Sequence, residues 1–169
     1  RDVVPENRKR IYDAREAVTL LSDIDAVLEL RPLFGRSIVT ALARIEGRPV
    51  GIIANDPGHL GGAIDSDSAD KASRFMQLCD AHGLPLISLC DTPGFMVGPE
   101  AEKTAQVRHF GRMFVTGASL AVPLVSVILR KAVGLGAMAM AGGSFHRNLL
   151  SVAWPTGELS GMGIEGAVT

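Results

Sequence analysis

A run of small and apolar residues between Pro123 and Gly143 constrains the fold of this chain more than any other segment. Its first part, PLVSVIL, is rich in β-branched residues and predicts a buried strand. After Arg130 and Lys131 the chain continues as VGLGAMAM, which predicts a turn into a helix with few bulky side chains at its start. The unpaired backbone N–H groups of such a helix start can stabilise a developing oxyanion. A tight turn that needs small residues only for packing fits the same sequence.

Length and composition favour a single compact domain. The chain has 169 residues and 47% hydrophobic residues, enough for a substantial core. Its 17 basic and 18 acidic residues give a net charge of -1, and no basic stripe with interleaved aromatic residues is present, which argues against a nucleic-acid binder.

The longest apolar stretch, 117–145, does not read as a membrane span, because Arg130 and Lys131 divide it into halves shorter than the roughly 20 residues that a spanning helix needs. Residues 1–16 are densely charged and lack the apolar segment of a signal peptide. We therefore expect the protein in the cytoplasm, or in the mitochondrial matrix if it is eukaryotic.

The first half of the chain predicts two strands followed by a helix. Segments 37–45 and 49–55 are rich in β-forming residues, and the short glycine-containing link between them favours a hairpin. Segment 69–82 has apolar residues at helical spacing, with polar residues before it that can cap a helix and Gly83 after it as a stop. Together they form a ββα unit, preceded by a short helical stretch around 8–21.

The second half repeats this order. A strand at 84–90 ends in the sharp turn DTPGF at 91–95, and a helix follows over 100–118. The strand at 123–129 then ends in the VGLGAMAM turn and another helix. Because ligands of open α/β sheets bind outside the carboxyl ends of strands, we expect the two turns to form halves of one site.

Side-chain constellations typical of hydrolases and metalloenzymes are missing. The sequence has no G-x-S-x-G elbow and no H-E-x-x-H motif, and its histidines have no spacing that marks a triad. The two cysteines, Cys79 and Cys90, have neither metal-ligand nor redox spacing and are expected to be buried thiols. Asp65, Asp67 and Asp70 are better explained as helix-start carboxylates than as a metal cluster. We expect no metal ion.

From about Tyr12 to Val168 the chain resembles the C-terminal half of the carboxyltransferase (β) subunit of biotin-dependent acyl-CoA carboxylases, the propionyl-CoA and acetyl-CoA carboxylase family. The motifs that carry the resemblance stand in the family's order: ELRPLFGRSIVTALARIEGRPVGIIAN, SADKASRFMQLCDAHGLPLISLCDTPGF, VILRKAVGLGAMAM and AWPTGELSGMGIEGAV. The resemblance implies an α/β fold of the crotonase-like (ClpP/crotonase) type, a spiral of ββα units. It also implies that residues 1–169 form the C-terminal carboxyltransferase domain of a longer chain.

The resemblance implies an enzyme that transfers a carboxyl group from N1 of carboxybiotin, carried on a protein, to the α-carbon of an acyl-CoA. This half would bind biotin and stabilise its ureido oxyanion through the backbone of Gly136 and Ala137, with Gly94 and Phe95 helping to bind the cofactor. Ala139 would lie where the family tunes the choice of acyl chain. The family's Y-G-G-A-Y aromatic residues are absent from VGLGAMAM, which leaves the substrate open.

The implied partners are a biotin carboxyl carrier protein, a biotin carboxylase, the N-terminal CoA-binding carboxyltransferase half and further copies of the same subunit. The isolated chain would be inactive. Two alternatives remain open at this point: a biotin-dependent acyl-CoA decarboxylase, which uses a similar carboxyltransferase site in the other direction, and a non-catalytic assembly module.

Two further motifs match the family but have simpler structural interpretations. The pair Arg108-His109 fits an ordinary salt-bridging pair on a helix. Trp154, followed by Pro155 and Thr156, is expected to anchor core packing. Glu165 could face the site, but the sequence does not decide this.

Overall fold

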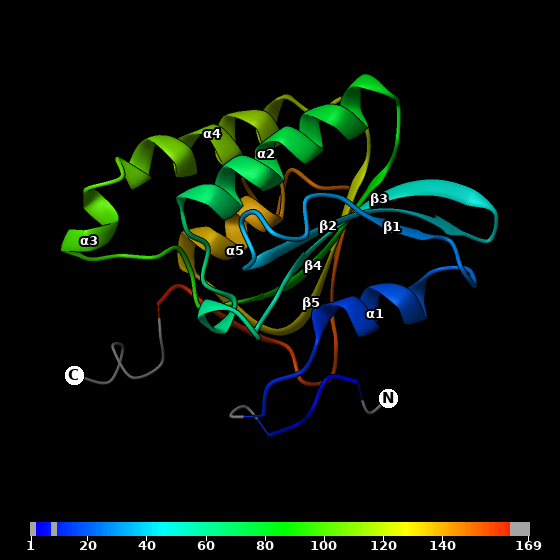
Figure 1. Ribbon diagram of the computed structural model, residues 1–169, viewed down its shortest axis with the longest axis horizontal. Helices are drawn as coiled ribbons and strands as arrows, with labels where there is room; N and C mark the ends of the chain where they lie inside the picture. The colour runs from blue at the N-terminus through cyan, green and yellow to red at the C-terminus, as the bar shows by residue number, and fades with distance from the viewer. Residues whose placement is uncertain (1–2, 8–9, 163–169) are drawn as a thin grey trace.

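A mixed seven-stranded sheet organises the part of the chain that the computed structural model describes, residues 3–7 and 10–162 (Figure 1). Its strands are β1 (Val27–Glu29), β2 (Ile38–Ile45), β3 (Arg48–Asn55), β4 (Leu86–Thr92), β5 (Leu124–Val133), β6 (Leu150–Ala153) and β7 (Glu158–Ser160). They lie in the order β1-β2-β3-β4-β5-β6, with β7 also paired to β5. The helices are α1 (Ala14–Leu21), α2 (Ser66–Ala81), α3 (Pro99–Glu102), α4 (Gln106–Ser119) and α5 (Gly134–Met140), with a 3₁₀ turn, η1, at Leu60–Gly62.

The predicted hairpin is confirmed. β2 and β3 are antiparallel and Ile45 pairs with Arg48, so the link is a two-residue turn. Both turn residues, Glu46 and Gly47, have positive φ (52° and 76°), as a turn that matches the twist of a hairpin requires. The Asp23 carboxylate accepts hydrogen bonds from both of their backbone N–H groups at 2.8 Å and holds the turn.

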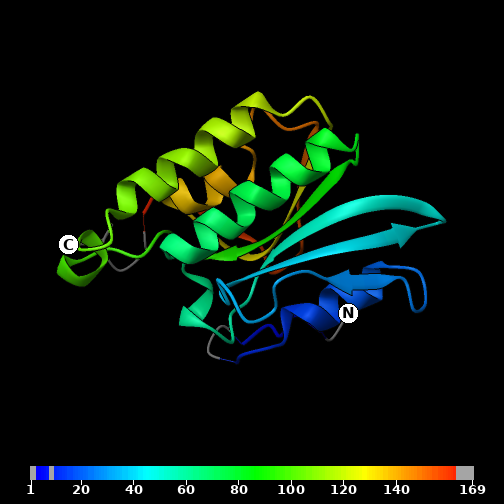
Figure 2. The same cartoon turned by 45° about the horizontal axis from the view of Figure 1, so that its top comes forward.

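The sheet is covered unequally on its two faces. α2, α4 and α5 lie on one face, and α1 lies on the other (Figures 1 and 2). The α2 side holds the larger apolar core, in which Phe75, Met76 and Met113 pack against the inward residues of the central strands. The smaller core on the α1 side includes Val18, Ile52 and Leu89. From β3 onward the strands pair in parallel with helical crossovers, in agreement with the expected crotonase-like α/β fold.

Several expected helix boundaries were wrong, each for a local reason. α1 begins at Ala14 rather than near residue 8, because Asp13 caps it by accepting from the Arg15 N–H. α2 begins at Ser66 with Asp65 as its cap, three residues before the expected start. The helix expected over 100–118 is two helices, because Ala105 adopts φ 53°, a left-handed conformation that ends α3 before α4 starts.

The C-terminal strands β6 and β7 were not predicted, and one prediction nearby was wrong. Trp154, expected to anchor the core, is 42% exposed at the end of β6. β6 is exposed along its whole length because it lies at the sheet edge, where no described helix covers it.

Candidate functional site

The two predicted turns meet at one edge of the sheet, as expected. β4 and β5 are neighbours and parallel, so the DTPGF turn and the start of α5 leave the sheet side by side. A Cβ built on Gly136 would lie 2.8 Å from the Cα and carbonyl carbon of Gly94 and 3.1 Å from the Phe95 nitrogen. Only glycine allows the two backbones to approach this closely.

The start of α5 offers backbone donors without a competing side chain. Gly134 has φ 57°, so right-handed helical geometry begins at Leu135. No side chain caps this end of the helix. With Val133 as the N-cap of α5, the N–H groups of Gly134, Leu135 and Gly136 have no acceptor within the helix. Gly136 and Ala137 are buried, which lowers the dielectric around their amides.

The DTPGF turn is held rigid by its own threonine. The Thr92 hydroxyl lies 3.1 Å from both the Gly94 N–H and the Gly94 carbonyl oxygen. The Gly94 amide is therefore already engaged, whereas the Phe95 N–H makes no hydrogen bond within the described ranges. The Phe95 ring stacks on Phe110 of α4, with ring centroids 3.7 Å apart. This stacking fixes the turn against the helical layer.

An apolar cavity of about 390 Å³ lies beside the start of α5. Its walls come from α5, β7 and the segment after α5: Gly134, Leu135, Met138, Phe145, Leu159, Ser160 and Gly161, with Ala132 at its base. Ala139, by contrast, is fully buried in the core and does not line this cavity. Within α5 it is therefore Leu135 and Met138, not Ala139, that face the open space.

A buried ionic cluster behind the two turns was missed by the sequence reasoning. Asp91 is fully buried and Arg130 is 3% exposed, and the Arg130 Nε and Nη2 atoms each lie 3.1 Å from Asp91 Oδ2. The Tyr12 hydroxyl donates to the same oxygen at 3.0 Å, and the Arg130 guanidinium lies 5.2 Å from the Tyr12 ring centroid. The signal that could have found this cluster was an aspartate and an arginine at the ends of two otherwise apolar strands.

Burial sets the pKa values of the titratable groups described next. Desolvation, reinforced by the nearby Asp91 carboxylate, raises the pKa of the Tyr12 phenol far above its ordinary value, so the phenol stays a hydrogen-bond donor. Burial raises the pKa of both Cys79 and Cys90 to about 12, so neither thiol is a nucleophile near neutral pH. Both cysteines are buried and free, as predicted.

The remaining candidate residues lie apart from the two turns. His109 Nδ1 lies 3.0 Å from Asp70 Oδ2 and links α4 to α2, in agreement with a salt-bridging role. Among the described residues no group of three or more His, Cys, Asp or Glu side chains could hold a metal ion. None of the helices in the described ranges is long and apolar enough to cross a membrane. Glu165 lies outside the described residues.

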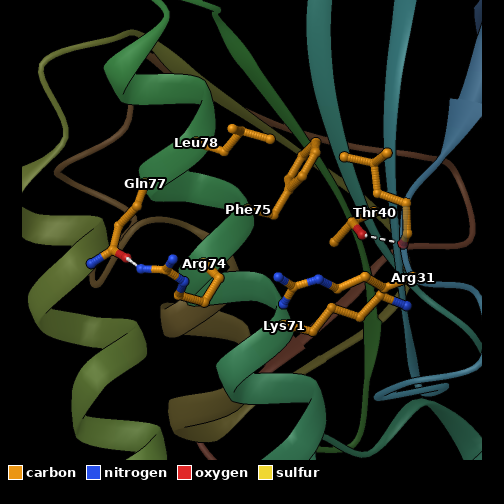
Figure 3. Close-up of a pocket in the computed structure, with 8 residues that line it drawn as sticks. Arg31, Thr40, Lys71, Arg74, Phe75, Gln77 and Leu78 are labelled. Atoms are coloured by element: carbon orange, nitrogen blue, oxygen red, sulfur yellow. Dashed lines mark hydrogen bonds between the residues drawn. The ribbon is translucent and has the colours of Figure 1, made fainter.

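A second cavity, also of about 390 Å³, lies between α2 and β2 (Figure 3). Figure 3 shows Lys71, Phe75 and Leu78 of α2 facing Thr40 of β2, with the Arg31 side chain reaching toward α2. Lys71 is only 1% exposed, and the acceptor of its ammonium group is the Gly35 carbonyl oxygen at 3.5 Å. Burial lowers the pKa of Lys71 to about 8.

The chain matches the family model of the carboxyl transferase domain over residues 1–169. It is 44% identical to the uncharacterized carboxylase YngE of Bacillus subtilis, over 99% of this chain and 32% of that protein. It is 38% identical to the methylmalonyl-CoA carboxyltransferase 12S subunit of Propionibacterium freudenreichii, again over 99% of this chain and 32% of the relative. The methylmalonyl-CoA decarboxylase α subunit of Propionigenium modestum is 36% identical, with 98% and 32% covered.

Solved structures of related carboxylases and transcarboxylases superpose closely on this chain. A single-chain, multi-domain long-chain acyl-CoA carboxylase superposes with a TM-score of 0.97 at 63% identity, over 99% of this chain and 17% of that one. The transcarboxylase 12S hexamer with methylmalonyl-CoA bound superposes with a TM-score of 0.93 at 37% identity, over 99% of this chain and 32% of its own. The chain thus spans a third or less of the lengths of these proteins.

Proposed function

Because the chain belongs to the carboxyl transferase domain family, we propose that it is the biotin-side half of an acyl-CoA carboxyltransferase. In this proposal it binds biotin on a carrier protein and acts together with a CoA-binding half of the enzyme. The observation that carries the proposal is the contact of Gly136 with Gly94 and Phe95, which brings two sets of backbone amides to one place.

Carboxyl transfer from biotin depends more on well-placed hydrogen-bond donors than on catalytic side chains. Carboxybiotin, when bound, would supply the carboxyl group. Loss of that carboxyl group would leave negative charge on the ureido oxygen of biotin. The residues of this chain would hold that oxygen with the N–H groups of Gly136 and Ala137 in the first turn of α5, aided by the free N–H of Phe95. Gly94, whose own amide is bonded to Thr92, would contribute the close approach rather than a donor.

The absence of a catalytic side chain among the two turns supports this assignment. Neither cysteine can ionise near neutral pH, and the buried Asp91 is engaged by Arg130 and Tyr12. Leu135 and Met138, the apolar side chains that α5 contributes to the cavity wall, would contact apolar parts of the ligand. Ala139 could affect the choice of acyl chain only by shifting α5, since its own side chain is buried in the core.

The test is a substitution at Gly136 in the complete carboxyltransferase. Gly136→Val would place side-chain atoms against the Gly94 backbone and displace the proposed donors, so we expect carboxyl transfer to fall by roughly a hundredfold or more. Gly111→Ala is the matched control, because a Cβ on Gly111 of α4 meets nothing within 4 Å. Full carboxyl transfer by a folded Gly136→Val enzyme would refute the role of these amides.

Reconstitution tests the assignment of the two halves. We expect this chain alone to be inactive and to gain carboxyl transfer when it is mixed with a CoA-binding half and a biotinylated carrier. Activity of this chain alone would contradict the division of labour. Binding of the carrier without any activity in the mixture would favour an assembly module.

Identifying the subunit that co-purifies with the complete protein tests the direction of carboxyl transfer. The similarity to the methylmalonyl-CoA decarboxylase α subunit keeps a decarboxylase as the second candidate. Co-purification of the complete protein with a biotin carboxylase supports the carboxylase, and co-purification with a membrane-bound decarboxylase subunit supports the alternative.

We also propose that the complete protein is a homo-oligomer, and its molecular mass in solution tests this.

A further inference from the structure

The backbone pairing between β4 and β5 is interrupted just before the two turns. Cys90 pairs with Ile128, but Thr92 pairs with Ala132, so a single residue of β4 faces three residues of β5. That single residue is Asp91. Such a bulge changes how far each strand extends beyond the sheet and therefore where the following turn begins.

The Asp91 side chain replaces the missing backbone contacts. Its Oδ1 atom accepts the Lys131 N–H at 3.1 Å, and its Oδ2 atom accepts from Arg130 and Tyr12. Both carboxylate oxygens are thus used: Arg130 and Lys131 belong to the bulge itself, and Tyr12 contacts Asp91 from outside the sheet. A carboxylate with charge-assisted bonds and no exposed surface has little freedom to move.

The same residue joins further segments. The Asp91 N–H donates to Asn55 Oδ1 at the end of β3, at 3.1 Å. Arg130 Nη1 donates to the Arg10 carbonyl oxygen at 2.9 Å, which ties the segment before α1 to the cluster. Lys131 Nζ donates to the Gly61 carbonyl oxygen at 2.8 Å. Asp91 is therefore the shared centre of contacts from β3, β5 and the N-terminal segment.

We propose that Asp91 is a positioning residue that sets the offset between the two glycine turns of the site. It lies three residues before Gly94, and its partner Arg130 lies four residues before Gly134. Fixing Asp91 against Arg130 and Lys131 fixes the distance at which Gly136 meets Gly94. The inference rests on the proposed function of these turns, and Asp91 itself contacts no reacting atom.

The experiment compares kcat and KM in the complete enzyme for transfer in the reverse direction, with free biotin as the carboxyl acceptor and a carboxylated acyl-CoA as the carboxyl donor, each varied in turn. Asp91→Asn keeps the shape but removes the charge, and we expect kcat to fall by about 10- to 100-fold, the effect of misplacing catalytic groups by about 1 Å. The KM for acyl-CoA should change less than twofold, because the proposed CoA site lies in the other half. Asp91→Glu restores the charge but adds a methylene, and should not restore kcat.

Tyr12→Phe is the second variant, because it removes one hydrogen bond to Asp91 without changing the packed volume. We expect it to lower kcat by roughly three- to tenfold, less than Asp91→Asn, because Asp91 keeps its bonds to Arg130 and Lys131 and is displaced less. Asp80→Ala is the matched control. Asp80 Oδ1 accepts the N–H groups of Ala121 and Val122 at 2.7 and 3.1 Å, at the opposite end of the same strands. Its loss should lower the thermal midpoint but not kcat.

All rates are measured at a temperature where each variant is folded. The inference is supported if Asp91→Asn, or Tyr12→Phe where Asp91→Asn does not fold, loses at least threefold more kcat than Asp80→Ala. It is overturned if these variants lose stability but keep the wild-type kcat, since Asp91 would then be structural only. If the wild-type enzyme shows no carboxyl transfer at all, the proposed function fails instead.

Discussion

Two buried charged side chains of this protein have opposite energetic consequences. Asp91 is surrounded by donors from Tyr12, Arg130 and Lys131, so its charge is compensated. Among the described residues, the ammonium group of Lys71 donates to a single carbonyl oxygen, at 3.5 Å. A buried cation with so little compensation lowers the stability of the fold.

Replacing Lys71 should therefore stabilise the protein in a pH-dependent way. The pKa of Lys71 is lowered from 10.5 to about 8 on folding, so between these values the unfolded chain binds more protons and stability rises with pH. Lys71→Met should raise the free energy of unfolding by about 1–3 kcal/mol at pH 7, and the gain should vanish as the pH rises from about 8 to about 10.5. Urea denaturation at several pH values measures this. Exposed Lys103→Met is the control, and an equal gain for both variants would contradict the explanation.

At the scale of elements, close backbone approaches at Gly136 and at Gly117 set how α5 and α4 pack. A Cβ on Gly117 of α4 would lie 2.7 Å from the carbonyl carbon of Gly142, in the turn that follows α5. This contact lets α4 lie directly against the turn that follows α5.

The two glycines of α4 provide a matched pair for this contact. Gly117→Ala should lower the free energy of unfolding by about 1–3 kcal/mol, because the backbone of Gly142 must move. The Cβ of Gly111→Ala meets open space, so this variant should raise the free energy of unfolding by up to about 1 kcal/mol through better helix propensity. Thermal or urea denaturation of both variants checks the prediction. Equal changes in stability for the two variants would mean that helix propensity alone, and not the contact with Gly142, sets the effect.

Elements with strong local signals were predictable and the others were not. The hairpin and α2 follow from β-forming runs, helical spacing and Gly83, whose φ is 66°. The break between α3 and α4 was missed because Ala105 rarely adopts a left-handed conformation and carries no signal in the sequence. β6 and β7 were missed because short strands at the C-terminal edge depend on pairing with β5, far away along the chain.

At the scale of the whole molecule, the sheet face that carries α1 is only partly covered. Leu150 and Val152 of β6 are exposed, as is Trp154 just after it, and an apolar cavity of about 390 Å³ lies between Val152, Trp154 and α1. An exposed apolar edge strand is a site for association with other chains.

We expect this chain, expressed alone, to self-associate as its concentration rises. Leu150→Lys should suppress the association by placing a charge on the edge strand, whereas Val107→Lys, at an exposed position on α4, should not. Sedimentation velocity over a range of concentrations measures this. Identical behaviour of the wild type and Leu150→Lys would show that β6 is not the associating surface.

The sequence by itself determined which segments form the two turns of the proposed site. The apolar strands, the DTPGF and VGLGAMAM turns and the family they identify are local features, read from neighbouring residues. Tertiary structure alone decided how the turns meet, because Gly94 and Gly136 lie 42 positions apart and their separation depends on strand order and on the β5 bulge. It also paired Asp91 with Arg130 and Tyr12, buried Ala139 and left Trp154 exposed, since burial is set by which elements cover a residue and not by its own type.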